Sequence, residues 1–190
     1  MSEQPPPAWK IMPAVRALRA RGLIAYPTEA VFGLGCDPND EAAVLRLLAA
    51  KHRRVEKGLI LAAADLDQLL PYITPLDAVR TERLRDTWPG PVTWLVPASD
   101  RCPTWIRGRH SAVAVRVSAH PVVRDLCRRF GGPIVSTSAN RAGREPARDA
   151  RSVRRAFGPV LDAIVNAPVG GAEKPSEIRD LASGRIIRAG

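Results

Sequence analysis

An apolar run gives way to hydroxyls and an amide in the segment Pro133-Ile134-Val135-Ser136-Thr137-Ser138-Ala139-Asn140. Ile134 and Val135 are typical of the end of a buried strand. The polar residues that follow would then lie at the mouth of the strand, where open α/β sheets bind ligands. A purely local role is the alternative, because Ser and Asn also cap helices and form turns.

Strand-like and helix-like patterns alternate on both sides of this segment. The alternation, without internal repeats, predicts a single α/β domain over residues 11–190 after a mobile, proline-rich tail at residues 1–10. The expected strands are at about 23–26, 59–61, 92–96, 112–117 and 161–165, with a hairpin around Gly184. The expected helices are at about 12–21, 40–51, 121–130 and 149–157, with others starting at Asp65 and at Thr74-Pro75 and the last of these reaching about residue 86.

Two glycines, Gly33 and Gly35, lie in an expected loop from Thr28 to Gly35. They allow either a close approach of the backbone to another group or a positive φ. The third glycine of a dinucleotide-binding fingerprint is missing, and the chain has no GxxxxGK[ST] sequence. Both familiar phosphate-binding loops are therefore excluded.

The composition points to phosphate-bearing ligands and to a reducing compartment. The chain has 190 residues, 45% of them apolar, and a formal net charge of +10. Such a charge attracts nucleotides or RNA, although the arginine enrichment equally fits the base composition of a genome. Three scattered cysteines form no disulfide framework, and neither a signal peptide nor a membrane-spanning run is present, so a cytoplasmic location is expected.

Basic residues occur at two informative positions. Lys51 and Arg53 follow a predicted helix, where they either complement the helix dipole or hold a triphosphate. Arg116 interrupts an apolar strand near its end, where a salt bridge to a carboxylate is the structural alternative to a binding role. Glu29 is a possible general base or a residue that orients its loop. The three histidines lack the spacing of metal ligands, so no protein metal site is predicted.

Six motifs in order give the chain a resemblance to the YrdC/TsaC threonylcarbamoyl-AMP synthases. The resemblance extends from about residue 12 to Gly190. The motifs are residues 26–35 (YPTEAVFGLG), Lys51-x-Arg53, residues 88–93 (WPGPVT), residues 114–117 (AVRV), residues 136–140 (STSAN) and residues 175–180 (PSEIRD).

This resemblance implies a short, single-domain enzyme with a twisted open mixed sheet flanked by helices and an electropositive concave cavity. It implies a nucleotidyltransferase that forms L-threonylcarbamoyladenylate from L-threonine, bicarbonate or CO2, and ATP, with release of pyrophosphate. Magnesium would accompany ATP. The product would feed the t6A modification of adenosine 37 in tRNAs that read ANN codons, through separate transferase proteins of the TsaD, TsaB and TsaE type.

The resemblance also assigns roles to residues. Lys51, Arg53, Ser138 and Asn140 match the family's KxR and SxN site, which holds the ATP phosphates and the reacting carbamate. Arg116 matches the arginine that binds the threonine carboxylate, with Thr28, Ser136 and Ser176 around the amino acid. Arg188 matches a nucleotide-binding position.

One departure and two alternatives accompany the resemblance. Many family members have proline directly after KxR, whereas this chain has Arg54, which puts the geometry of that loop in question. An RNA-binding or ribosome-maturation factor that uses a basic concave face is the main alternative function. A second alternative, a carbamoyl-transfer domain like that of hydrogenase maturation factors, is less well supported, because those proteins carry this module within a much longer chain.

Overall fold

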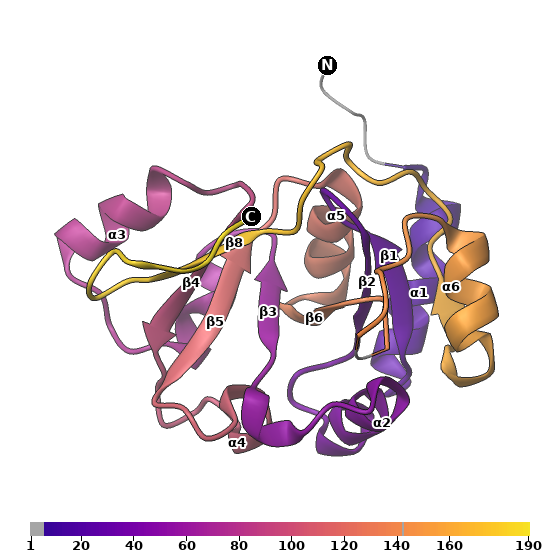
Figure 1. Cartoon of the computed structure of the whole chain (residues 1–190), viewed down its shortest axis with the longest axis horizontal. Helices are drawn as coiled ribbons and strands as arrows, with labels where there is room; N and C mark the ends of the chain where they lie inside the picture. The colour runs from indigo at the N-terminus through magenta and orange to yellow at the C-terminus, as the bar shows by residue number, and fades with distance from the viewer. Residues whose placement is uncertain (1–5, 142) are drawn as a thin grey trace.

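Nine strands join into one mixed sheet in the part of the chain that the computed structural model describes, residues 6–141 and 143–190 (Figure 1). The strand order is β7-β1-β2-β6-β3-β5-β4-β8-β9. Three pairs, β1–β7, β3–β5 and β4–β8, are parallel, and the others are antiparallel. The strands are β1 (Ile24–Pro27), β2 (Phe32–Gly35), β3 (Ile60–Ala63), β4 (Val92–Pro97), β5 (Ala112–Val117), β6 (Ile134–Ser138), β7 (Ala163–Ile164), β8 (Glu177–Asp180) and β9 (Ile186–Arg188).

Helices flank this sheet, as predicted. Figure 1 shows α3 and α6 at opposite sides of the molecule. The α-helices are α1 (Ala8–Arg19), α2 (Glu41–Lys51), α3 (Ala78–Arg85), α4 (Thr104–Arg107), α5 (Pro121–Phe130) and α6 (Ala150–Phe157). Three short 3₁₀ helices are η1 (Val55–Lys57), η2 (Asp67–Tyr72) and η3 (Gly158–Val160).

The sheet has an apolar core on each face, because successive residues of a strand point to opposite sides. Ile24 and Ile134 belong to a core formed with α1 and α5. Ala25 and Val135, the next residues along the two strands, belong to the larger core on the other face, which contains residues of α2 and α6. A strand that is buried on both faces needs apolar residues at consecutive positions, which explains the pair Ile134-Val135.

The last part of the chain returns across the sheet. Figure 1 shows it, in yellow, crossing in front of the strands from the α6 side toward α3. It adds β8 parallel to β4 and then turns back at Gly184 into β9, so the predicted C-terminal hairpin is confirmed. The hairpin brings Ser176 and Arg188 onto the same part of the sheet as β4 and β5.

Three helices begin elsewhere than the sequence predicted. The helix expected from Asp65 is the 3₁₀ helix η2, which starts at Asp67. Ala8 opens α1, so Ala8 to Lys10 are helical and not part of a tail, while residues 1–5 lie outside the described residues. Pro7, with φ −57°, is already set for a helix that starts directly after the prolines. The helix expected from Thr74-Pro75 starts only at Ala78, because the Asp77 side chain accepts a hydrogen bond from the Arg80 amide and caps it.

The expected loop from Thr28 to Gly35 is wrong in its second half, where Phe32–Gly35 form β2. Gly35 needs no positive φ there; it provides a close approach instead. A Cβ on Gly35 would lie 2.4 Å from the Val135 carbonyl oxygen, and one on Gly33 would lie 3.2 Å from the Tyr26 ring. Strand β6 also continues beyond the expected end at Val135, through Ser138. Pairing with β1 and β6 therefore makes a strand from a glycine-rich segment of low strand propensity.

We expect the three thiols to be unreactive in the native protein. Cys36, Cys102 and Cys127 are free and buried, and burial raises the pKa of Cys102 to about 11 and that of Cys127 to about 12. Because the thiolate is the reactive form, labelling with a disulfide reagent at pH 8 should be slow until the chain is unfolded, when three thiols should react. A thiol that reacts stoichiometrically within the mixing time would contradict this.

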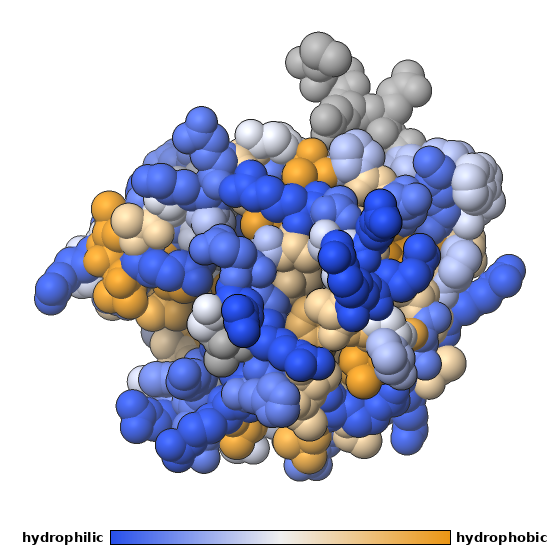
Figure 2. Space-filling model, turned by 45° about the vertical axis from the view of Figure 1, so that its right-hand side comes forward, coloured by the Kyte–Doolittle hydropathy of each residue, from blue (hydrophilic) through white to orange (hydrophobic). Residues whose placement is uncertain are grey.

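One face of the molecule is mainly polar at its surface (Figure 2). Hydrophilic side chains cover most of the face shown in Figure 2, with apolar side chains scattered among them. Within the described residues, no helix is both long and apolar enough to span a bilayer.

Candidate functional site

A cavity of about 720 Å³ lies over the sheet on the same face as α1 and α5, where those helices leave the strands uncovered. The strand register explains its floor. Ser136 pairs with Ile60, Ile60 with Ala114, and Ala114 with Leu95, and all four residues line the cavity. Several of the lining residues are glycine, alanine or serine, which leave open space above the backbone. The volume is in the range typical of small-molecule sites.

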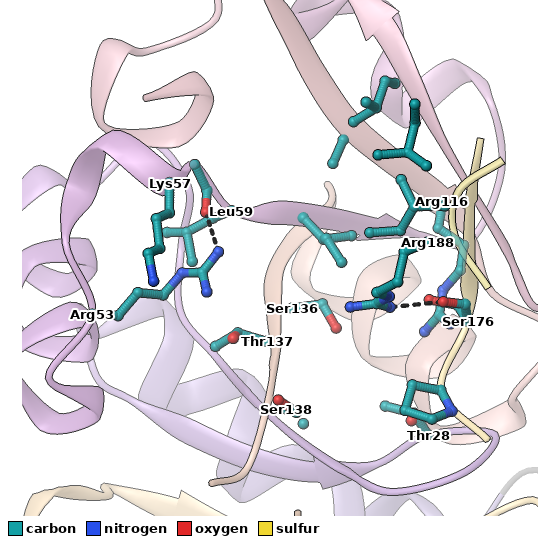
Figure 3. A pocket seen from close by; sticks show the side chains of 18 of the residues that line it. Thr28, Arg53, Lys57, Leu59, Arg116, Ser136, Thr137, Ser138, Ser176 and Arg188 are labelled. Carbon is teal, nitrogen blue, oxygen red and sulfur yellow. Dashed lines mark hydrogen bonds between the residues drawn. The ribbon is translucent and has the colours of Figure 1, made fainter. Parts of the chain in front are cut away.

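Basic side chains dominate the charged lining of this cavity. Among the described residues, seven arginines and lysines line it, against a single carboxylate, Glu29. Figure 3 shows two groups of them, with Arg53 and Lys57 at one end and Arg116 and Arg188 at the other. The seven are Arg53, Lys57, Arg107, Arg109, Arg116, Lys174 and Arg188.

Lys51 is the last residue of α2 and holds the end of β6. His52 follows in the left-handed conformation, φ 51° and ψ 44°, so the chain turns away from the helix axis. The Lys51 ammonium donates to the Ser138 carbonyl and, at 2.8 Å, to the Asn140 carbonyl. Lys51 is buried and is not part of the cavity lining; it fixes the loop that presents Ser138.

Arg53, unlike Lys51, points into the cavity. One of its terminal nitrogens donates to the Gly58 carbonyl at 2.9 Å, and Lys57 lies beside it in Figure 3. Burial and the charge of Arg188 lower the pKa of Arg53. Its Nε is buried and has no hydrogen-bond partner among the described residues, so the side chain keeps donor capacity for an anion.

Ser138 and Asn140 contact each other but face different spaces. The Ser138 hydroxyl donates to Asn140 Oδ1 at 2.6 Å, and the Asn140 amide donates to the Arg144 carbonyl at 2.7 Å. Ser138 lines the main cavity, whereas Asn140 lines a second, smaller hollow beside α6. Asn140 thus orients Ser138 in this structure. Lys51 and Ser138 are thus in direct contact, but of these two residues only Ser138 faces the cavity in which the resemblance places the ATP phosphates.

The other end of the cavity brings together Thr28, Arg116, Ser176 and Arg188. The Thr28 hydroxyl donates to the Val31 carbonyl at 2.7 Å. Ser176 Oγ is 3.0 Å from the hydroxyl of Thr93, a fully buried residue. The Ser176 carbonyl accepts a hydrogen bond from the Arg188 guanidinium at 2.7 Å. With Ser136 on the floor, the four residues that the resemblance placed around the amino acid all line this cavity, and so does Arg188. Of the four residues that it placed at the phosphates, Arg53 and Ser138 line the cavity, whereas Lys51 and Asn140 do not.

The salt bridge expected for Arg116 is confirmed, and the residue also faces the cavity. Its guanidinium lies 3.2 Å from Glu29 Oε2. Burial by itself would raise the pKa of Glu29, but Arg116 and the Ser118 hydroxyl together hold the pKa below its usual value. The carboxylate is therefore charged at neutral pH.

Sequence reasoning missed Lys57 and Thr93, and it left the partner of Glu29 unidentified. Lys57 had a usable signal, since it is one of four lysines in the chain and follows Arg53 by four residues. Thr93 had none, because a threonine in a strand is ordinary, and only the pairing of β4 with β8 brings it to Ser176.

Arg54 does not change the loop after Lys51. Its backbone has φ −70°, which proline also adopts, and its side chain is 81% exposed, with an ion pair to Glu56 at 3.4 Å. The loop geometry at this position is thus compatible with either residue.

We expect the burial of Lys51 to appear as a pH dependence of stability. Burial, with a contribution from Arg53, lowers the pKa of Lys51 to about 8. Between pH 8 and the ordinary lysine value of about 10.4, the unfolded state binds more protons than the folded state, so the Lys51 contribution to stability should increase with pH. Urea unfolding at pH 7 to 10 gives the free energy of unfolding of the wild type and of Lys51→Met. The difference between the two proteins isolates the Lys51 contribution, since the thiols and tyrosines are common to both. A constant difference across the window would contradict the prediction.

Comparisons with known proteins identify the family of this chain. Residues 16–190 match the Sua5/YciO/YrdC family, described as "Telomere recombination". The threonylcarbamoyl-AMP synthase of Cellvibrio japonicus is 54% identical over 184 residues, which cover 95% of this chain and 97% of that protein. The corresponding enzyme of Chromohalobacter salexigens is 55% identical over 179 residues, covering 94% and 96%.

Solved structures show the same architecture. The crystal structure of P. abyssi Sua5 complexed with L-threonine superposes with a TM-score of 0.88 at 32% identity, covering 95% of this chain and 53% of that one. E. coli YciO, at 24% identity, has the same fold, with a TM-score of 0.87 over 98% of this chain and 92% of its own. A family match across most of the sequence, together with relatives identical at more than half of their aligned positions, establishes that this chain belongs to the Sua5/YciO/YrdC family.

Proposed function

We propose that this protein is a threonylcarbamoyl-AMP synthase, which uses ATP, L-threonine and bicarbonate or CO2. The observation that carries the proposal is the separation of two cationic groups across one cavity, Arg53 with Lys57 and Arg116 with Arg188 (Figure 3). The reaction needs two anionic groups held at once, a triphosphate and an amino-acid carboxylate. Relatives named for this activity and a threonine complex of Sua5 support the same assignment.

The chemistry requires positioning more than a protein nucleophile. The threonine amine adds to CO2 and loses one proton, which gives a carbamate anion. A carbamate oxygen then attacks the α-phosphorus of ATP, the bond from that phosphorus to the bridging oxygen breaks, and pyrophosphate leaves. Two anions must approach each other, so cations and donors around the phosphates lower the barrier.

The residues divide this work between them. Arg53 and Lys57 hold the phosphates. Ser138 lies at the end of β6, where Lys51 and Asn140 keep it in place, and its hydroxyl must leave Asn140 Oδ1 before it can donate to a phosphate. Arg116 binds the threonine carboxylate, with Thr28, Ser136 and Ser176 around the amino acid. Arg188 belongs to the Arg116 end of the cavity (Figure 3), and burial together with the nearby charge of Arg188 lowers the pKa of Arg53.

Magnesium is part of this proposal as a component of the MgATP substrate. Glu29 is the one carboxylate in the described cavity lining and is paired with Arg116, so the protein offers no cluster of acidic ligands there. Phosphate oxygens and water would hold the ion, as is common for Mg²⁺. The proposal also places the enzyme in the cytoplasm, upstream of t6A transfer to tRNA by separate proteins.

Omission of each substrate in turn tests the activity. Pyrophosphate release should require ATP, L-threonine and bicarbonate together, and mass spectrometry should identify threonylcarbamoyl-AMP. Release that continues without threonine would overturn the assignment. Salt-sensitive RNA binding without turnover would instead favour the RNA-binding alternative, which the named relatives do not favour.

A further inference from the structure

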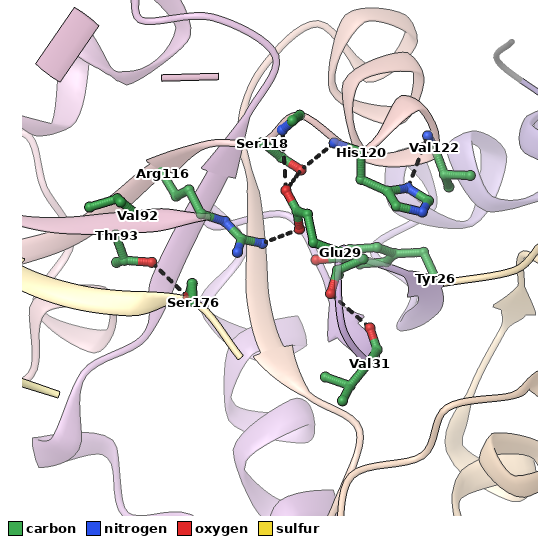
Figure 4. Close-up of polar contacts among 12 residues, drawn as sticks. Tyr26, Glu29, Val31, Val92, Thr93, Arg116, Ser118, His120, Val122 and Ser176 are labelled. Carbon is green, nitrogen blue, oxygen red and sulfur yellow. Dashed lines mark hydrogen bonds and ion pairs between the residues drawn. The ribbon is translucent and has the colours of Figure 1, made fainter. Parts of the chain in front are cut away.

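Glu29 places a negative charge in a cavity wall that is otherwise basic. Its Oε2 lies 3.2 Å from the guanidinium of Arg116, and the two side chains are only 15% and 7% exposed (Figure 4). It is the one acidic residue among the described residues that line the cavity. Such a pair is weakly screened by water and salt, so it affects any anion bound nearby.

The structure holds this carboxylate firmly in place. Glu29 Oε1 accepts hydrogen bonds from the Ser118 hydroxyl at 2.7 Å and from the Ala119 amide at 3.1 Å. Its carbonyl oxygen accepts from the Ala172 amide at 2.8 Å. Gly170 packs against the same backbone so closely that a Cβ there would lie 3.1 Å from Glu29 Cα. The carboxylate therefore cannot turn away from Arg116 without breaking several contacts.

Glu29 makes the two ends of the cavity electrostatically different. Arg116 and Arg188 are close enough for the charge of Arg116 to lower the pKa of Arg188, and Glu29 reduces the net charge of this group from +2 to +1. At the opposite end, Arg53 and Lys57 have no acidic neighbour in the described lining. A carboxylate carries one negative charge and a polyphosphate carries several. The Arg53 and Lys57 group therefore attracts a polyphosphate more strongly than the Arg116 and Arg188 group does.

We propose that Glu29 is a specificity-determining residue, which makes the Arg116 end of the cavity selective for a singly charged carboxylate and directs polyphosphate to the Arg53 end. The inference rests on the proposed function and extends it by naming what keeps the two anionic substrates apart. Glu29 acts through Arg116 and is not itself a catalytic residue.

The test compares threonine binding with and without inorganic pyrophosphate. Equilibrium dialysis with labelled L-threonine gives its affinity for the wild type, for Glu29→Gln, which removes the charge, and for Glu29→Asp, which keeps it. For the wild type and Glu29→Asp, the threonine affinity measured with saturating pyrophosphate should stay within about twofold of the affinity measured without it. Pyrophosphate should weaken threonine binding to Glu29→Gln by about 10-fold or more, because the added net positive charge favours a polyanion over a monoanion.

A control separates this effect from a general change in charge. Asp125→Asn removes a carboxylate from an ion pair with Arg129 on α5, outside the cavity, and should behave as the wild type. Equal pyrophosphate effects on the wild type and Glu29→Gln would overturn the proposal. So would displacement of threonine from Glu29→Asp, which remains a test if Glu29→Gln fails to fold. Absence of threonine binding to the wild type would refute the proposed function instead.

Discussion

Arg53→Ala should lower the rate of ATP- and threonine-dependent pyrophosphate release by about 100-fold or more. Arg53 directs a half-buried guanidinium into the cavity, and its Nε has no hydrogen-bond partner among the described residues. Removing a preorganised donor to a developing or migrating negative charge commonly costs this much. The loss should appear in the catalytic rate and in the KM for ATP. The unfolding midpoint should change little, because among the described residues the Arg53 side chain donates one hydrogen bond, to the Gly58 carbonyl.

Arg54→Ala is the matched control, since it removes the same side chain from the next residue. The Arg54 side chain is 81% exposed and forms an ion pair with the exposed Glu56, and surface ion pairs of this kind contribute little to stability. The activity and the unfolding midpoint of Arg54→Ala should remain near those of the wild type. Near-normal pyrophosphate release from Arg53→Ala would remove Arg53 from the site, whereas equal losses in both variants would point to a general dependence on basic charge.

Gly35→Ala should destabilise the protein by about 3 kcal/mol or more. The new Cβ would lie 2.4 Å from the Val135 carbonyl oxygen and 2.9 Å from the Tyr26 ring. The same carbonyl accepts a hydrogen bond from the Tyr26 hydroxyl at 3.1 Å, so moving it would break a buried contact. Urea unfolding measures the loss, and activity should fall as well, because Val135 precedes Ser136 in β6.

Gly132→Ala provides the comparison for this effect. A Cβ there would meet nothing within 4 Å, and its φ is not in the left-handed region. The substitution should therefore be neutral or stabilise the protein by about 0.4–1 kcal/mol, through the lower entropy of the unfolded chain. If Gly35→Ala and Gly132→Ala unfold at the same urea concentration, the close packing between β2 and β6 is not a constraint.

Local patterns account for the order of the elements. Residues 92–96, 112–117 and 121–130 appear as strand, strand and helix at or within one residue of the predicted bounds. Each contains a run or period of apolar residues that is bounded by Pro, Gly or a cap, and such signals act over a few residues. The same reasoning failed for Phe32–Gly35, where cross-strand pairing outweighs the low strand propensity of glycine.

The candidate site, too, has features that the sequence could predict and features that it could not. Hydroxyls at the end of β6 and an arginine in β5 are visible as polar interruptions of apolar runs, so Ser136, Ser138 and Arg116 could be singled out before any coordinates. The direction of Lys51 toward two carbonyls, and not into the cavity, depends on a contact between residues 87 and 89 positions apart. A local pattern contains no information about such a contact.

Apolar periodicity, capping residues and the motif order were enough to predict an α/β chain with candidate binding residues at strand ends, because those features depend on neighbours in sequence. Which charges share a wall of the cavity depends on strand order and register, which bring the loop after β1, strand β5 and the C-terminal hairpin to one cavity. The pairing of Glu29 with Arg116 and of Thr93 with Ser176 arises only there, because these partners lie 87 and 83 residues apart and meet through the assembled sheet.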